Sequence, residues 1–187
     1  MNPVTHLLAG WIIADECKLE PRDRAFVAWA CVLPDIDGIG YVIDFANKIS
    51  GRAETIYYET YHHNWGHGLP AAILTAVMVY CFAIEKRKTA LLALMTFHLH
   101  LLMDLAGSRG SSPYDIWPIP YLAPFSEKLT IYWSGQWPLT GWQNTTITIL
   151  LMAFCLYTAI QRGNSPVILF NKRADSVFVD TLRRRFY

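Results

Sequence analysis

Charged residues are scarce in this chain of 187 residues, since Asp, Glu, Lys and Arg make up 17% of it, against roughly 25% in an ordinary soluble domain. Hydrophobic residues make up 53% and aromatic residues 14%. An excess of one charge sign is also lacking, because 16 basic residues face 15 acidic ones and the formal net charge is +1. Such a chain has no basic field to attract nucleic acid, so we expect no nucleic-acid partner. The composition indicates either a very apolar globule or a membrane protein.

Cysteine chemistry and the common nucleophile motifs are also lacking. The four cysteines lie far apart, beside or within apolar runs, and form no Cys-x-x-Cys pair, which favours packed thiols over disulfides or a zinc knuckle. No Gly-x-Ser-x-Gly elbow and no phosphate-cradling glycine loop occurs, so Ser nucleophiles and nucleotide binding are disfavoured. The first residues lack the early Lys or Arg of a removable signal peptide, and we expect this segment to be retained.

Long apolar runs without a sustained period of two predict helices. We expect an all-α fold, an up-and-down bundle of about five helices, forming one helical metal-binding domain over residues 1–187. A mixed segment follows the second helix, a loop rich in Pro, Trp and Tyr follows the fourth, and the amphipathic tail "DSVFVDTLRRRF" should dock as a short helix. The expected helices are 4–16, 24–34, 67–86, 88–105 and 143–162, with the mixed segment at 41–62 and the loop at 106–142.

Three of the runs approach the length of a membrane span. They hold 16 to 19 residues and reach roughly 24–28 Å, against about 30 Å of hydrocarbon. In an up-and-down bundle the basic segments 18–24, 85–88 and 183–185, with Arg162, fall at one end, and the histidines fall at the other. The positive-inside rule places the basic end in the cytoplasm. A soluble bundle with basic loops is the alternative that length alone leaves open.

Histidines and aspartates gather at that second end. His100 and Asp104 are four residues apart, so they share one helix face. His63 and His67 have the same spacing, whereas His62 and His67 converge only if a helix begins between them, and both pairs remain open. Two carboxylates of "LPDIDG" can both turn inward only if that turn is irregular. The full set is His6, Asp35, Asp37, His62, His63, His67, His98, His100 and Asp104.

Ionisable groups are costly in so apolar a chain unless something compensates them, and a divalent cation would do so. The candidates outnumber the four ligands of a tetrahedral site, so we expect two metal ions, or one ion with carboxylates around its ligands. Imidazole and carboxylate donors without thiolate favour zinc, manganese or iron over calcium, with zinc first. The candidate ligands are His6, Asp35, Asp37, His62, His67, His100 and Asp104.

Several motifs carry a family resemblance over nearly the whole chain. An early "TH" is followed by "LPDID", "HHNWGHGL", "HLHLLMD", "GSSPYDIWPI", "WSGQWPLTGWQN" and "SPVILFNKRADSVFVDTLRRRF". Together they resemble the YdjM-like, LexA-binding family of inner-membrane-associated metal-dependent hydrolases, whose motif order is similar to the zinc phospholipase C and P1 nuclease group. The resemblance implies a bacterial inner-membrane location, a hydrolase and, through the LexA-binding label, a regulatory protein partner.

The resemblance also implies a ligand assignment. The family pattern His-Arg-x-x-Thr-His maps onto 62–67, which makes His62 and His67 the ligands. His63 stands where Arg is common and Gly66 where Thr is common, so the choice between His62 and His63 stays open. The pattern His-x-x-x-Asp maps onto His100 and Asp104. His98 lies outside it and is expected to pack or to contact a ligand.

The chemistry expected of such a centre is hydrolysis by a metal-activated water, whose pKa falls toward about 7 on zinc. Asp35 or Asp37 would orient the water and take its proton, and Arg109 in "GSRGSS" is the candidate for binding a substrate phosphate. By analogy we expect a phosphoester, with a lipid or other membrane-associated substrate. The alternative is a non-catalytic, metal-stabilised membrane protein that binds a regulatory partner, and transport of metal ions ranks third.

Overall fold

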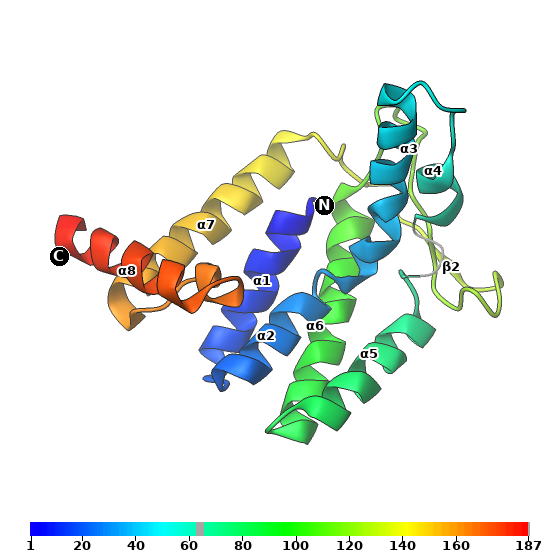
Figure 1. Ribbon diagram of the computed structural model, residues 1–187. Coiled ribbons are helices and arrows are strands. Elements are labelled where there is room, and N and C mark those ends of the chain that lie inside the picture. The colour runs from blue at the N-terminus through cyan, green and yellow to red at the C-terminus, as the bar shows by residue number, and fades with distance from the viewer. Residues whose placement is uncertain (63–65, 187) are drawn as a thin grey trace.

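The computed structural model describes residues 1–62 and 66–186, and over these the chain is helical, as predicted. Its only strands in that part of the chain, β1 (Ile119–Pro120) and β2 (Thr130–Ile131), form a two-residue antiparallel pair. Figure 1 shows the principal helices, with α5 and α6 side by side and α1 between α6 and α7. These helices are α1 (Pro3–Glu16), α2 (Pro21–Ala30), α5 (Leu69–Phe82), α6 (Lys86–Gly107) and α7 (Trp142–Arg162).

Prolines explain where the expected helix boundaries were wrong. The second helix begins at Pro21, earlier than expected, because proline suits the first turn of a helix, and it ends at Ala30. A 3₁₀-helix, η1 (Leu33–Ile39), then begins with Pro34 in its first turn. The third expected helix is shortened to α5, with Gly68 as its N-cap. His67 therefore lies before α5, and the expectation of a helix beginning at 67 was wrong.

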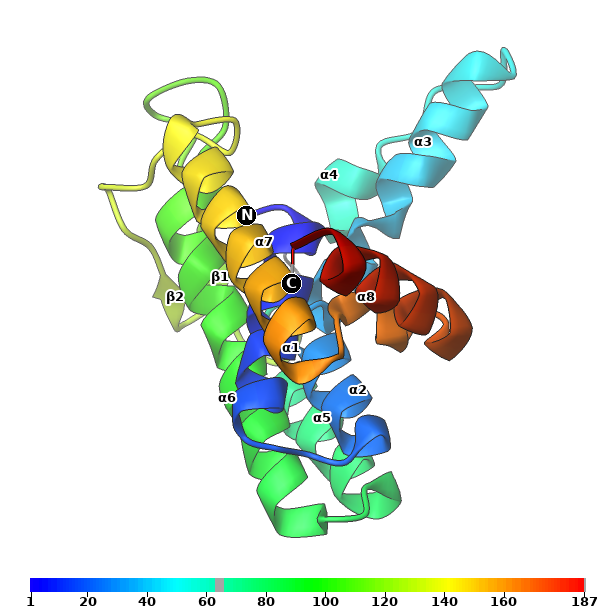
Figure 2. The same ribbon diagram turned by 90° about the vertical axis from the view of Figure 1, so that its left-hand side faces the viewer.

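The segment expected to be mixed contains two further helices, α3 (Gly40–Ile49) and α4 (Tyr57–Tyr61). Figure 2 shows them projecting from the bundle, and they pack on each other and on η1. The tail forms η2 (Pro166–Leu169) and the predicted helix α8 (Lys172–Phe186). The bundle of about five helices is thus extended by an arm and by a C-terminal helix that lies across α7.

Small residues and the large aromatic side chains of Trp11 and Phe97 fill the bundle interior. Trp11 of α1 is fully buried against Leu8, Ala28 and Cys155. Alanines allow α2, α5 and α6 to approach closely in a second cluster. At the basic end, Asp23 accepts hydrogen bonds from the amides of Ile84 and Glu85 at 2.9 and 2.8 Å, and Arg162 donates to Asp15 at 2.7 Å. These contacts join the basic segments that the sequence placed together.

Two helices of the described chain, α6 and α7, are long and apolar enough to cross a membrane. A third candidate is the pair formed by α2 and the continuous segment of η1 and α3, which is bent by 56°. Only 22% of the apolar 18-residue stretch of α7 that could cross a membrane is buried inside the protein. Most of the apolar side chains of α7 therefore face outward. The apolar character of the chain is therefore concentrated on outer helix faces, which a bilayer would cover.

Buried amides fasten the long loop over one end of the bundle. Gln136 pairs with both backbone groups of Trp117, at 3.0 and 2.9 Å. Asn144 at the start of α7 accepts from the Trp137 indole at 2.7 Å and donates to the carbonyls of Gly107 and Leu139 at 2.7 and 2.8 Å. The loop is thus held against the end of α6, where the predicted ligands lie.

Candidate metal centre

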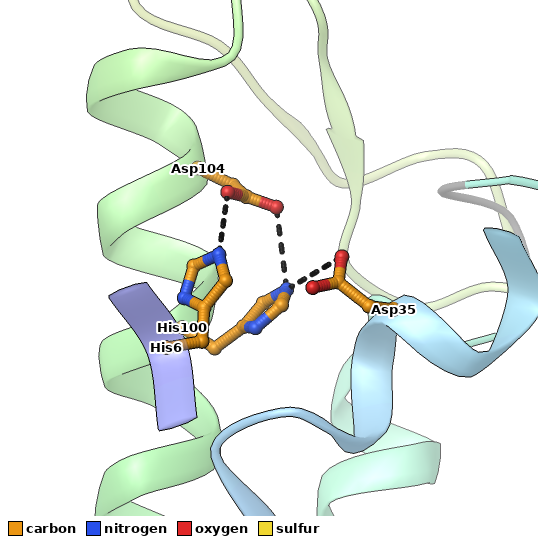
Figure 3. A group of neighbouring side chains, drawn as sticks. All are labelled: His6, Asp35, His100 and Asp104. Atoms are coloured by element: carbon orange, nitrogen blue, oxygen red, sulfur yellow. Dashed lines mark hydrogen bonds and ion pairs between the residues drawn. The ribbon is translucent and has the colours of Figure 1, made fainter. Parts of the chain in front are cut away.

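Four of the predicted ligands form one buried group contributed by three elements (Figure 3). His6 is in the first turn of α1, which Asn2 caps by accepting a hydrogen bond from the Thr5 amide at 2.9 Å. His100 and Asp104 are one turn apart on α6, and Asp35 comes from η1. The four ligand atoms lie within 4.8 Å of one another.

Asp104 is the common partner in this group. One of its oxygens lies 3.1 Å from His6 Nε2, and the other lies 3.2 Å from His100 Nε2. The two imidazole rings stack with centroids 3.8 Å apart. Asp35 completes the group, with Oδ1 at 3.7 Å from His100 Nε2. The α-ammonium of Met1 also makes an ion pair with Asp104.

Asp37, His62 and His67 form a second group, again with ligand atoms within 4.8 Å of one another. The carboxylate of Asp37 lies 2.8 Å from His62 Nδ1 and 3.1 Å from His67 Nδ1. It also accepts a hydrogen bond from the Gly66 amide at 3.1 Å. A Cβ at Gly66 would come within 2.5 Å of the Pro34 carbonyl, so this close approach requires glycine.

His67 connects the two groups. While Nδ1 faces Asp37, Nε2 lies 3.3 Å from His100 Nε2 and 3.6 Å from Asp104 Oδ2. The structure therefore brings all seven predicted ligands into one continuous cluster. It also shows why two aspartates only two residues apart both contact histidines, because the turn that carries them is a 3₁₀-helix. With three residues per turn, positions i and i+2 lie roughly 120° apart around the helix axis rather than on opposite faces, so both carboxylates can reach histidines.

The hydrogen bonds of two rings define which nitrogens carry lone pairs. His100 Nδ1 lies 2.8 Å from the Cys31 carbonyl, and His67 Nδ1 faces a carboxylate. Both partners only accept hydrogen bonds, so each Nδ1 carries the proton and each Nε2 of a neutral ring carries a lone pair. When both rings are neutral, their two lone pairs face each other and Asp104. These acceptors repel one another, and a metal cation among them, in addition to the Met1 ammonium on Asp104, would remove that repulsion.

Burial reinforces this chemistry. His6, His67 and His100 are fully buried, and Asp104 is 2% exposed. Burial is the main cause that lowers the pKa of His6 to about 2, helped by the nearby Met1 ammonium, so this imidazole is neutral, the form that binds metal. Asp35 Oδ2 is buried and has no hydrogen-bond partner among the described residues. Neutral imidazoles, carboxylates and an unpartnered oxygen form a donor set that fits a divalent transition metal.

A cavity of about 560 Å³ reaches this cluster. Its polar lining includes Asp35, His62 and Asp104, and its apolar lining includes Tyr58, Trp117 and Leu139. Burial, together with the nearby carboxylates of Asp35 and Asp37, raises the pKa of Tyr58. Tyr58 was not among the residues predicted for the site, and it lies in the segment 41–62 that was expected to be mixed. Trp117 is the one loop aromatic among the lining residues, whereas Tyr114 and Trp142 are strongly exposed.

Two candidate residues, His98 and Arg109, lie apart from the cluster, and a third, His63, lies outside the described residues. His98 bonds to the Tyr121 hydroxyl at 2.9 Å and to the Leu94 carbonyl at 2.8 Å, on another side of α6. Arg109 is not among the residues that line the cavity, and its backbone pairs with the 137–139 segment. His63 lies outside the described residues, so the choice between it and His62 stays open, although His62 is placed beside Asp37.

The fold and the cluster define an all-helical membrane protein with a candidate His/Asp metal centre. A family model described as the YdjM inner membrane protein matches residues 1–173, and the chain belongs to this family, as its motifs predicted. It is an inner-membrane protein with two or three apolar helices long enough to span a membrane. No curated protein and no solved structure matches the chain, so the expected likeness to zinc phospholipase C and P1 nuclease is not confirmed.

Proposed function

We propose that the protein is a membrane metallohydrolase that cleaves a phosphoester of an amphiphilic, phospholipid-like substrate. The observation that carries the proposal is the convergence of buried imidazole lone pairs and carboxylates at a cavity wide enough for a substrate group. A cluster that only stabilised the fold would be expected to be closed by protein ligands. Here the cavity reaches Asp35 and Asp104 directly.

The donor set supports zinc first, in one or two ions. His6, His100 and Asp104 would hold one ion with His67 Nε2, and Asp37 with His62 would either hold a second ion or orient His67 through its Nδ1 proton. Carboxylates commonly orient ligating histidines in this way. When bound, the metal supplies Lewis-acid chemistry: it lowers the pKa of water and polarises an ester oxygen.

Asp35 suits the role of proton acceptor better than Asp37. Its Oδ2 has no hydrogen-bond partner among the described residues, and the residue lines the cavity. Asp37 is already engaged by two imidazoles and by the Gly66 amide. A base must keep an oxygen within reach of the reacting water, so Asp35 would take the proton while Asp37 keeps the histidines oriented.

The cavity walls support an amphiphilic substrate. Tyr41, Tyr58 and Trp117 offer aromatic surface to an apolar substrate group, and Ser108 and Asn2 offer hydrogen bonds. The metal would bind the ester itself. Arg109 remains the candidate for an additional phosphate contact, although it lies outside the residues that line the cavity.

The test is hydrolysis of phosphodiesters and phospholipids by purified, metal-loaded protein. We expect the wild type to cleave one of these classes and Asp35→Asn to lose activity by roughly 10²–10⁴-fold, the range for a general base, while still binding metal. Asp180→Asn, an exposed site on α8, is the matched control and should retain activity. If the wild type binds metal, His100→Gln loses it, and neither substrate class is cleaved, the proposal is wrong. The non-catalytic protein that binds a regulatory partner would then take its place.

A further inference from the structure

The arm formed by residues 40–61 comprises α3, the connecting turn and α4. It turns Asp44, Asn47 and Thr55 inward and several large apolar side chains outward. Asp44 of α3 accepts hydrogen bonds from the Thr55 hydroxyl at 2.6 Å and from the Tyr58 amide at 2.8 Å. Asn47, one turn further on, donates to Thr55 at 3.1 Å. These side chains fasten α3 to the returning chain, and Gly40 allows the closest approach, since a Cβ there would meet the backbone of Tyr57 at 2.7 Å.

The opposite face of α3 is apolar and exposed. A helix at a water-facing surface turns its polar face outward, and α3 does the reverse. Scattered exposed apolar residues are ordinary, but a contiguous patch marks an interaction surface. Its members are 53–70% exposed, and they are Tyr41, Val42, Phe45 and Ile49.

Size and charge indicate what covers this face. Ten residues of α3 extend only about 15 Å, half of the hydrocarbon thickness, so α3 cannot cross the membrane by itself. It could cross only together with α2, as the pair bent by 56°, but α2 packs against α1 and α6 inside the bundle. Its far end carries exposed Lys48 and the polar turn around Arg52, which would not enter hydrocarbon. Tyr41, Tyr57 and Tyr61 lie along the arm, and tyrosine is enriched where membranes meet water. The chain is an inner-membrane protein, so lipid is available to this face.

We propose that the arm is a membrane-interface element that lies along the bilayer surface with its apolar face in contact with lipid. Such contact satisfies the exposed apolar side chains without deep insertion of the polar tip. This surface adjoins the metal cluster, because the arm packs on η1, the element that carries Asp35 and Asp37.

Two cavities connect the arm to the cluster. Tyr41 and Tyr58 line the cavity that reaches Asp35. A recess of about 340 Å³ lies between α3 and α4, lined by Ile39, Ile43, Tyr57 and Tyr61 together with Asp37. An arm resting on lipid therefore opens both cavities at the bilayer surface, where an amphiphile has only a short path to the cluster. The contact with lipid does not depend on hydrolysis or on bound metal.

The proposal is tested by the environment of a fluorophore attached to the arm. Val42→Cys and Ile49→Cys, each in a Cys17→Ser, Cys81→Ser background, place a nitrobenzoxadiazole label on the apolar face. The labelled full chain is reconstituted in vesicles of phosphatidylethanolamine and phosphatidylglycerol. Arg87→Cys, in the basic turn at the other end of α6, is the control for water, and Leu150→Cys, exposed on α7, is the control for hydrocarbon.

We expect both arm labels to be quenched by lipids carrying a nitroxide near the headgroup and to be shielded from aqueous iodide. The label at position 49 should lie at the same shallow depth in the bilayer as the label at position 42. Iodide quenching equal to that of the Arg87 label would overturn the proposal. Shielding from iodide and from nitroxide lipids together would also overturn it, because another protein surface, such as a second copy of the chain, would then cover the arm. His100→Gln should leave the quenching unchanged, which separates this test from the proposed hydrolase.

Discussion

Asp37 shows how one carboxylate organises the centre at the scale of a residue. It contacts the Nδ1 atoms of His62 and His67 at 2.8 and 3.1 Å. Because Nδ1 of His67 bears the proton, its Nε2 lone pair points at His100 and Asp104. The carboxylate thereby selects the tautomer that binds metal, even where it does not bind the metal itself.

Replacing Asp37 by Asn should therefore weaken metal binding without abolishing it. An amide can present an N–H donor to the ring, so the preferred tautomer is lost, and outer carboxylates of this kind are worth roughly 10–100-fold in affinity. Competition with a chromophoric chelator measures the change, with Asp180→Asn as the control. Loss of one of two bound ions at saturating metal would instead make Asp37 a direct ligand of its own ion.

The sequence predicted which histidines and aspartates gather at one end of the bundle, but it did not predict how they are joined. The spacing of His100 and Asp104 defined a shared helix face, and the structure has it. The role of His67 as a link could not be predicted, because it depends on Gly66 allowing the 3₁₀ turn to approach within contact distance. Tyr58 could not be predicted either, since nothing in the sequence distinguishes it from Tyr57 and Tyr61 in the same short helix.

At the scale of elements, the hydrophobic pattern predicted which segments form the long helices. It did not predict where these helices begin and end. Proline and glycine at positions 21, 34 and 68 set the boundaries through local stereochemistry. The two helices of the arm were missed because they are short, with ten residues in α3 and five in α4, and so few turns give a weak helical pattern. The loop over the site is held by the side-chain amides of Gln136 and Asn144, and two of its aromatic residues, Tyr121 and Trp137, add hydrogen bonds.

Asn144 tests that account of the loop. Its side chain satisfies the Trp137 indole and two backbone carbonyls, at 2.7 and 2.8 Å, and it is 3% exposed. Asn144→Ala leaves these groups without partners, and each buried unsatisfied group costs about 1–3 kcal/mol. We expect a lower Tm in detergent and faster proteolysis between residues 108 and 141. Gln143→Ala, the neighbouring residue on α7, is the control, and an equal loss in both variants would contradict the account.

At the scale of the whole molecule, the cluster joins segments far apart in the chain. His6 and Asp104 are 98 positions apart, and Asp35 and His67 come from elements between them. A metal held by α1, η1 and α6 would connect these elements in the folded state only. Ligands that bind the native state stabilise it by mass action, by about 2.7 kcal/mol at 100 times the dissociation constant.

Metal removal should accordingly lower the stability of the entire bundle. We expect a chelator to decrease the Tm of the wild type and to leave that of His100→Gln nearly unchanged, because that variant has no metal to lose. Differential scanning fluorimetry across a series of metal concentrations measures the effect. A wild-type Tm that is independent of both chelator and metal would show that the cluster does not join these elements through an ion.

Membrane orientation follows from the same arrangement. The basic turn at 85–88 lies at the end opposite the cluster, and positive residues are retained in the cytoplasm. Protease added to sealed inverted vesicles should cleave this turn, whereas protease added to right-side-out vesicles should not. Cleavage only in right-side-out vesicles would place the cluster on the cytoplasmic side.

Histidines and aspartates of α1, η1 and α6 are expected to hold a transition metal, and elemental analysis of the purified protein would detect it. Two histidines on one helix give a matched pair, because His98 bonds to Tyr121 whereas His100 faces Asp104. We predict stoichiometric metal, zinc foremost, in the wild type and in His98→Gln, and its loss in His100→Gln. Wild-type protein without stoichiometric transition metal, or equal metal content in the two variants, would contradict the account.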